Sequence, residues 1–228
     1  MGKRTGTDLG DRMGKHATHI VWDWNGTLFD DVEAVVDATS EIFAPYGLGP
    51  FGIEEFRAFY TRPIWVAYER LLGRALEDGE WERLDGAWHD SYHRLMARCG
   101  LAADARSTIE VLTAAGHTQS LLSMWRHEQL VPTIARLGLA DAFRRVDGLR
   151  LPEQAGGHKA ELLVRHLAGL GIDAVDVMLI GDSADDAMAA RAVGARAVLY
   201  AGGVTARAAL ERLGVPVVTR LTDAVAHI

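Results

Sequence analysis

The sequence predicts an α/β protein with a Rossmann-like parallel sheet as its core and an inserted α-helical domain. Two observations indicate this. From about residue 105 onward, short apolar runs alternate with helical stretches, a pattern typical of crossover units in a parallel sheet covered on both faces. Residues 31–104 instead show apolar residues at helical spacing. The 228 residues are enough for one large domain, or for one domain that carries an insertion.

Composition narrows the class of protein. Hydrophobic residues make up 49% and charged residues 24% of the chain, as in globular proteins. The formal net charge of −7 argues against a broad nucleic-acid surface. Cys99 is the only cysteine, which fits a reducing compartment, and no apolar run is long enough to suggest a membrane span or signal peptide. We therefore expect a cytoplasmic monomer or homodimer without nucleic-acid or membrane partners.

The N-terminal segment, residues 1–17, holds four glycines and four Lys or Arg residues without an apolar period, so we predict a flexible tail. The apolar run at residues 19–22 predicts the first strand, which ends at Asp23. Asn25 and Gly26 follow it and indicate a turn. Residues 18–30 therefore begin the core.

The inserted domain spans residues 31–104. Apolar residues at helical spacing predict a helix over 32–46, ended by Gly47 and Pro50, and a second long helix over 81–99. Two shorter helices are expected at 56–60 and 64–72.

Residues 105–228 complete the core. Strands are expected at 118–123, 143–146, 177–180, 197–200 and 215–218. Helices are expected at 105–115, at 158–170, at 184–193, at 206–213, and before Gly138, the last with Pro132 in its first turn.

Polar residues gather where strands of this core end and helices begin. They are Asp23, Asn25 and Thr27 after the first strand, Ser123 after the next, Lys159 at a helix start, and Gly181-Asp182-Ser183 with Asp185 and Asp186. In an open parallel sheet, ligands bind beyond the carboxyl ends of the strands. We therefore expect these residues to form one site.

The residue types in this set suit one chemistry. A carboxylate at a strand end can act as an oxygen nucleophile, and Mg²⁺ prefers carboxylate and carbonyl oxygens. A hydroxyl, an ammonium and turn N–H groups can hold phosphoryl oxygens. Carboxylates this close together repel one another unless a cation lies among them. The set therefore predicts metal-assisted phosphoryl transfer.

The ordered set resembles the haloacid dehalogenase (HAD) superfamily of phosphohydrolases. The resemblance covers about residues 18–30 and 105–220 and is carried by Asp23-Trp24-Asn25-Gly26-Thr27-Leu28, Ser123, Lys159 and Gly181-Asp182-Ser183-Ala184-Asp185-Asp186. The stretch at residues 137–143 is similar to the phosphoglycolate-phosphatase-like members, whose α-helical cap domain corresponds to residues 31–104. The resemblance implies a HAD-like core with this cap, and a Mg²⁺-dependent phosphatase of a small phosphorylated metabolite.

Roles for individual residues follow from the same resemblance. It implies three catalytic positions, with Asp23 as the nucleophile that forms an aspartyl-phosphate, beside Asn25 and Lys159. Phosphate would be bound by Ser123, Met124, Lys159, Trp24 and Gly26, and Mg²⁺ would be held by Asp23, the backbone carbonyl of Asn25, Asp182 and Asp186. Thr27 would brace the loop. Arg62 and Arg126 are candidates for contact with the rest of the substrate.

Asn25 departs from the family pattern, in which the phosphatases carry a second Asp as general acid and base. An amide cannot move that proton, and such help is worth about 10²–10⁴-fold. Three explanations stay open: a substrate such as an acyl phosphate whose leaving group needs no proton, a relative that binds phosphorylated ligands without turnover, or deamidation at the Asn-Gly sequence. Met124 and Ala160 are smaller departures that remove no catalytic group.

Carbon–halogen or carbon–phosphorus cleavage is a lesser alternative, because relatives with those activities also lack the second Asp. The metal-binding pair Asp182 and Asp186 argues against a metal-free dehalogenase. Phosphonate cleavage in this family usually needs a cap lysine, and residues 31–104 contain no lysine.

Overall fold

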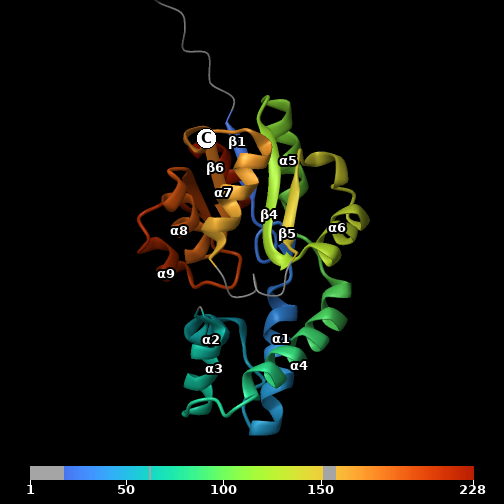
Figure 1. The fold of residues 1–228 in the computed structure, drawn as a ribbon, viewed down its shortest axis with the longest axis vertical. Helices are drawn as coiled ribbons and strands as arrows, with labels where there is room; N and C mark the ends of the chain where they lie inside the picture. The colour runs from blue at the N-terminus through green and yellow to red at the C-terminus, as the bar shows by residue number, and fades with distance from the viewer. Residues whose placement is uncertain (1–17, 62, 151–157) are drawn as a thin grey trace, which may run out of the picture.

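The main sheet of the protein has six parallel strands in the order β5-β4-β1-β6-β7-β8 (Figure 1). The computed structural model describes residues 18–61, 63–150 and 158–228, so the predicted tail at 1–17 lies outside the described residues. The strands are β1 (His19–Trp22), β4 (Thr118–Arg126), β5 (Val146–Leu149), β6 (Val177–Gly181), β7 (Arg196–Tyr200) and β8 (Val217–Val218). The predicted parallel α/β core is confirmed.

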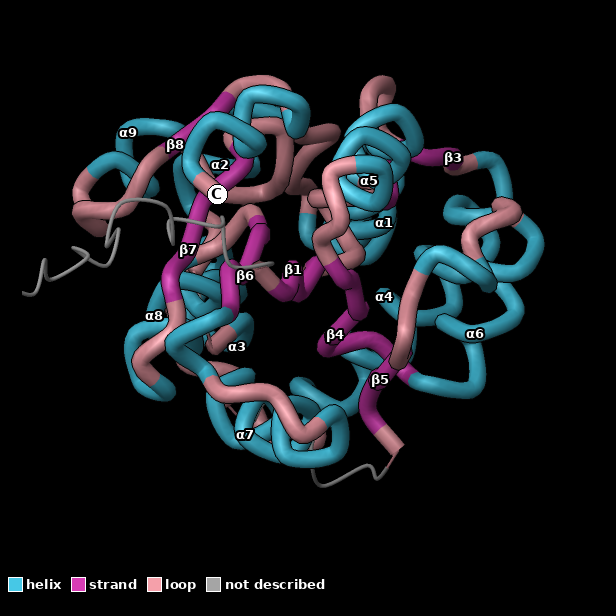
Figure 2. Tube along the Cα trace, turned by 90° about the horizontal axis from the view of Figure 1, so that it is seen from above, coloured by secondary structure: helices cyan, strands magenta, loops and turns pink. Residues whose placement is uncertain are grey.

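Helices cover both faces of this sheet, because successive strand residues point to opposite sides. Ile20 faces a core shared with α5 (Ala105–Ala114), α6 (His127–Arg136) and the C-terminal 3₁₀ helix (Leu221–His227). Val21 faces α7 (Lys159–Leu170) and α8 (Ala184–Val193). Figure 2 shows these two groups of helices on opposite sides of the row of strands. The short helix α9 (Arg207–Glu211) packs beside β7.

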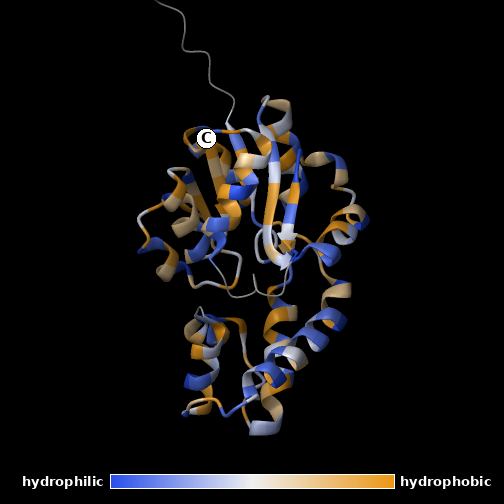
Figure 3. Ribbon diagram, viewed as in Figure 1, coloured by the Kyte–Doolittle hydropathy of each residue, from blue (hydrophilic) through white to orange (hydrophobic). Residues whose placement is uncertain are grey.

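Four helices lie beyond the end of the sheet to which the β4 arrow points in Figure 1. They are α1 (Val32–Phe43), α2 (Ile53–Phe59), α3 (Ile64–Leu72) and α4 (Glu80–Leu95). Short 3₁₀ helices continue α1 through Ala44–Tyr46 and α4 through Met96–Arg98. In Figure 3 hydrophobic and hydrophilic residues alternate along these helices, as expected for elements with one buried face. Among the described residues, no helix is both long enough and apolar enough to cross a bilayer.

A two-stranded antiparallel ribbon connects the four helices to the core. It consists of β2 (Phe29–Asp30) and β3 (Gly100–Leu101). The periodicity of the sequence did not predict it, because a strand of two residues is too short to show an alternating pattern. The pairing means that the chain leaves the core and returns to it at the same place.

Two predicted boundaries around Ser123 were wrong. The strand β4 continues to Arg126, and its pairing with β5 shifts register between Leu122 and Arg126, in the segment that contains Ser123. The helix α6 therefore begins at His127, and Pro132 lies in its second turn rather than in its first. A proline there removes a single backbone hydrogen bond.

The strand predicted at residues 143–146 was placed too early. Pairing with β4 begins at Arg144, whose N–H donates to the Gln119 carbonyl at 2.8 Å, and the regular strand β5 runs over Val146–Leu149. Phe143 is buried in the core just before this strand. Its apolar side chain therefore produced a strand signal outside the strand itself.

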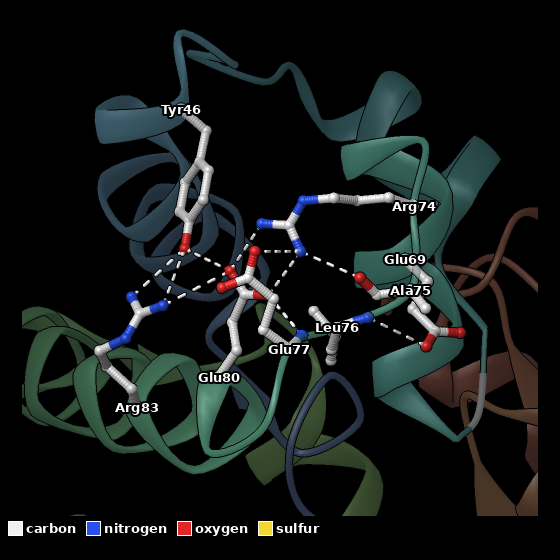
Figure 4. A network of polar contacts seen from close by, with 8 residues as sticks. All are labelled: Tyr46, Glu69, Arg74, Ala75, Leu76, Glu77, Glu80 and Arg83. Atoms are coloured by element: carbon white, nitrogen blue, oxygen red, sulfur yellow. Dashed lines mark hydrogen bonds and ion pairs between the residues drawn. The ribbon is translucent and has the colours of Figure 1, made fainter.

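A buried carboxylate, Glu80 at the start of α4, connects α4 to the segments that follow α1 and α3 (Figure 4). Arg74 donates two hydrogen bonds to it at 2.7 and 2.9 Å, the Tyr46 hydroxyl donates at 2.9 Å, and the Glu77 N–H donates at 2.9 Å. These donors, Arg74 above all, hold the pKa of Glu80 well below its usual range. The network ties the loop before α4 to the 3₁₀ helix that follows α1.

A chain of polar side chains begins at the N-terminal ends of β1 and β4 and continues to α7 and β5. The imidazole of His19 is hydrogen-bonded to Thr118 Oγ1 at 2.7 Å and to Ser120 Oγ at 2.8 Å. His166 contacts the same Ser120 Oγ at 2.7 Å and Asp147 at 2.8 Å. Burial lowers the pKa of His19 to about 4 and also lowers the pKa of His166. Both imidazoles are therefore neutral at pH 7.

These histidines predict a loss of stability in mild acid. In the unfolded chain a histidine titrates near its ordinary pKa of 6.5, so below that pH the unfolded state binds protons that the folded state excludes. The contribution of these neutral histidines to the free energy of unfolding is complete above pH 6.5 and falls as the pH drops toward 4. For His19 the loss at pH 5 is about 2 kcal/mol. Urea unfolding at pH 7 and pH 5 measures it.

The matched variant is His19→Asn, whose amide keeps a hydrogen bond but does not titrate. We expect its free energy of unfolding to change less between pH 7 and pH 5 than that of the unmodified protein. An equal change in the two proteins would contradict the assignment to His19.

Candidate active site

The carboxyl ends of β1, β4 and β6 meet the N-terminal ends of α7 and α8 at one edge of the sheet. Asp23 directly follows β1 and Asp182 directly follows β6. These two strands are neighbours, and the chain order of the sheet reverses here. This is the position at which open α/β sheets bind their ligands.

Three carboxylates and one ammonium form the centre of the site. Asp23, Asp182 and Asp186 are buried, and a group of their carboxylate oxygens lies within 4.8 Å of one another. Lys159, at the first position of α7, is also buried and donates hydrogen bonds to Asp23 Oδ1 and to Asp186 Oδ1. A single ammonium cannot balance three ionised carboxylates, so ionisation of all three would leave an excess of negative charge.

The pKa shifts in the cluster reflect burial first and the neighbouring charges second. Burial raises the pKa of Asp23 to about 6, although Lys159 acts in the opposite direction. Burial, together with the charges of Asp23 and Asp186, raises the pKa of Asp182. Burial alone would lower the pKa of Lys159, but Asp186 and Asp23 outweigh it and the net shift is upward. Lys159 therefore remains an ammonium at neutral pH.

Asp182 is the carboxylate that the ammonium does not reach. Its Oδ2 accepts the N–H of Val204 at 2.8 Å, and among the described residues no Lys, Arg or His forms an ion pair with it. A buried carboxylate without a cation is costly. Its position beside Asp23, in a set of hard oxygen donors, fits a divalent ion such as Mg²⁺.

The loop after β1 has a conformation that requires glycine at one position. Gly26 has φ +71°, and a Cβ built there would lie 2.7 Å from Asp182 Oδ2. Thr27 Oγ1 donates a hydrogen bond to Asp23 Oδ2 at 3.2 Å. The Trp24 carbonyl accepts the N–H groups of Thr27 and Phe29. These bonds hold Asp23 at the strand end in one orientation.

Ser123, Met124 and Trp24 are the other residues predicted to bind phosphate. Ser123 is buried, and its hydroxyl lies 3.4 Å from Asn25 Oδ1, so the structure brings these two predicted residues together. Met124 follows Ser123 and is half-buried. The Trp24 side chain is buried and stacks on Phe29 with ring centroids 5.2 Å apart, so only its backbone is available to a ligand.

Of the two predicted substrate arginines, only Arg126 is among the described residues, and it is not part of the cluster. Arg62 is outside the described residues. Arg126 is exposed and lines a cavity of about 510 Å³ beside α4, together with His89 and Trp125. Tyr92 lines the same cavity.

Three residues next to the site were missed by the sequence analysis. Asp31 and Tyr92 both bind the Asn25 side chain. Arg57, on α2, donates hydrogen bonds to the carbonyls of Gly202 and Gly203 at 3.0 and 2.9 Å. A Cβ at Gly203 would lie 1.9 Å from Asp182 Oδ2, so Arg57 binds the loop that packs on Asp182. The only signal in the sequence for any of the three was the pair Asp30-Asp31, which follows the Asp23 motif after Phe29.

The chain is similar in sequence to known proteins. The model of the haloacid dehalogenase-like hydrolase family matches residues 20–200. The chain is 28% identical to phosphoglycolate phosphatase 1 of Pseudomonas aeruginosa over 211 residues, which cover 90% of this chain and 77% of that protein. It is 27% identical to phosphoglycolate phosphatase of Chromobacterium violaceum, covering 83% of this chain and 87% of that one.

Solved structures show the same fold. A haloacid dehalogenase-like hydrolase from Streptococcus pneumoniae superposes with a TM-score of 0.78 at 18% identity, covering 92% of this chain and 98% of that one. A hydrolase from Pseudomonas syringae has a TM-score of 0.72 at 21% identity and covers 92% and 97%. The α/β fold that the sequence predicted is therefore shared with these proteins.

Proposed function

Because the chain belongs to the haloacid dehalogenase-like hydrolase family, we propose that it is a Mg²⁺-dependent phosphatase of a small phosphorylated metabolite. The observation that carries the proposal is the buried cluster of Asp23, Asp182 and Asp186 around Lys159. The names of the relatives, phosphoglycolate phosphatases, support a small phosphorylated acid as one substrate to test. Residues 31–104 serve in this proposal as the cap over the site.

Asp23 is the nucleophile in the proposed reaction. Lys159 and Thr27 each bind one of its oxygens and so orient the carboxylate at the strand end. An Asp23 oxygen forms a bond to phosphorus while the bond from phosphorus to the leaving oxygen breaks. Water then hydrolyses the aspartyl-phosphate and releases phosphate.

Lys159 and Ser123 bind the phosphoryl group in this proposal. The ammonium lies against Asp23, where it also offsets the charge that accumulates on the phosphoryl oxygens. Mg²⁺ would be held by Asp23, Asp182 and the backbone carbonyl of Asn25, supported by Asp186, and would neutralise phosphoryl charge when bound. Asp182 is free of competing cations among the described residues, which supports this role.

Asn25 determines which substrates should react fast. Its amide cannot protonate a departing alkoxide, so alkyl phosphates lose the general-acid contribution of about 10²–10⁴-fold. Acyl phosphates keep most of their reactivity because their leaving group is a stable carboxylate. A second candidate function, favoured by the same residue, is a catalytically impaired relative that binds a phosphorylated ligand.

Phosphate release from a panel of compounds tests the proposal. The panel contains acetyl phosphate, 2-phosphoglycolate, p-nitrophenyl phosphate and several sugar phosphates, each with Mg²⁺ and after removal of metal with EDTA. We expect release that requires Mg²⁺, is absent from Asp23→Ala and is fastest with acetyl phosphate. If the protein binds these compounds with Mg²⁺ but releases no phosphate, the binding function holds instead. Equal release from Asp23→Ala and the unmodified protein would refute the proposed nucleophile.

A further inference from the structure

The side-chain amide of Asn25 is fully engaged on one side. Its Nδ2 donates to Asp31 Oδ2 at 2.8 Å and to the Tyr92 hydroxyl oxygen at 2.7 Å. An amide nitrogen carries two hydrogens, so these two contacts use both. Tyr92 belongs to α4, and its hydroxyl in turn donates to Asp31 Oδ2 at 2.5 Å.

Asp31 is the residue that sets this orientation. It is 1% exposed, and its three partners are the Asn25 amide, the Tyr92 hydroxyl and the Gly26 N–H, which donates to Oδ1 at 2.7 Å. Among the described residues, no basic side chain pairs with it. Burial raises the pKa of Asp31, although the three donors act in the opposite direction. All three partners donate to its oxygens, so the nitrogen of the Asn25 side-chain amide faces Asp31 and the side-chain oxygen faces away.

The side-chain oxygen of Asn25, Oδ1, consequently faces the side of the site where we expect the phosphoryl group to bind. Ser123 Oγ lies 3.4 Å from it, and Ser123 is the residue expected to bind phosphate. Where the family resemblance implies a general acid, the site therefore presents a hydrogen-bond acceptor. When the bond from phosphorus to that oxygen breaks, the electron pair stays on the oxygen, and Asn25 has no free hydrogen to supply.

We propose that Asn25 and Asp31 form a matched amide–carboxylate pair, positioned by Tyr92, that restricts fast turnover to phosphoryl donors whose leaving group departs without a proton. The substrate class is acyl phosphates and the phosphates of acidic phenols. The inference rests on the proposed phosphatase function and deepens it. Asp31 and Tyr92 are positioning residues, since they act through Asn25.

Because of this pair, the single substitution Asn25→Asp would change both the stability of the protein and its catalysis. In Asn25→Asp, a second carboxylate would stand where the amide now lies 2.8 Å from Asp31, and two buried carboxylates at that distance repel each other. Exchanging the two residues, Asn25→Asp with Asp31→Asn, keeps one amide and one carboxylate. The exchange moves the carboxylate to the side of the site that Ser123 borders.

The first measurement does not depend on activity. Urea unfolding in EDTA compares the unmodified protein, the two single variants and the exchange variant, and intact mass confirms that Asn25 is not deamidated. We expect Asn25→Asp to lower the unfolding midpoint and Asp31→Asn, added to it, to recover most of the loss. The control is Asp30→Asn, since Asp30 is the adjacent exposed carboxylate. Purely additive effects of the two single changes would overturn the pair.

The second measurement is the dependence of kcat on the pKa of the leaving group, in a series of aryl and alkyl phosphates. We expect a steep dependence in the unmodified protein and in Asp30→Asn, and a flatter one in the exchange variant, with about 10²-fold gains on alkyl phosphates. If Asn25 and Asp31 had only a structural role, the dependence of kcat on the leaving-group pKa would not change. An exchange variant that is active but shows the same dependence as the unmodified protein would therefore overturn this inference and leave the proposed phosphatase function standing. Absence of Asp23-dependent turnover in every variant would refute the proposed function and the substrate restriction together.

Discussion

Replacing Asp23 with Asn is expected to lower kcat for phosphate release by at least about 10³-fold, as removal of a catalytic nucleophile does in other hydrolases. The amide has nearly the shape of the carboxylate but cannot form the acyl-phosphate bond. The variant should fold, because Lys159 keeps its ion pair with Asp186 at 2.5 Å. Initial rates on the best substrate of the panel, at saturating Mg²⁺, measure the loss.

The matched control for this variant is Asp185→Asn, since Asp185 lies next to the cluster in the chain but is not among its three buried carboxylates. We expect it to keep most of the activity. Acid-quenched protein analysed by intact mass should carry a phosphoryl group in the unmodified enzyme and none in Asp23→Asn. Phosphoryl labelling of both proteins would place the covalent intermediate on another residue.

Replacing Lys159 with Met is expected to impair both stability and activity. Lys159 is the only lysine after residue 15, and among the described residues it is the cation paired with Asp23 and Asp186. Its loss leaves buried carboxylates unpaired, which costs about 3–5 kcal/mol of unfolding free energy. Activity should fall by at least about 10²-fold, because the phosphoryl oxygens lose a preorganised charge. Urea unfolding and initial rates measure the two effects.

The variant Lys159→Arg separates the charge from the shape of the side chain. It keeps a cation against both carboxylates, so we expect it to retain more stability than Lys159→Met, although its larger planar group does not fit the site equally well. A Lys159→Met variant as stable as the unmodified protein would show that the ion pairs contribute nothing net to folding.

The core of the site could be predicted from the sequence because each of its residues is marked locally. Asp23 and Asp182 each follow a short apolar run, and Lys159 begins a helix. Parallel strands bring their carboxyl ends to one edge whatever the loops between them do. Motifs separated by more than a hundred residues therefore converge without any knowledge of their contacts.

Contacts that depend on how the helices beyond the sheet are oriented could not be predicted in this way. Tyr92 was recognised only as part of an apolar helical stripe, yet its hydroxyl reaches Asp31, which lies 61 residues away in the chain. Arg57 similarly contacts the loop at Gly202 and Gly203. Neither residue stands in a motif, because a hydrogen bond between distant segments requires no pattern near either partner.

The amino-acid sequence by itself determined the parallel α/β core, the inserted helices and the identity of the residues after each strand, since periodicity and strand-end motifs are local properties. Tertiary structure decided the charge balance around Lys159, the unpaired position of Asp182 and the orientation of the Asn25 amide. The physical reason is that burial and hydrogen-bond direction depend on which distant groups meet. In Asn25, the sequence shows an amide in place of an acid, but only its contacts with Asp31 and Tyr92 show which atom faces the site.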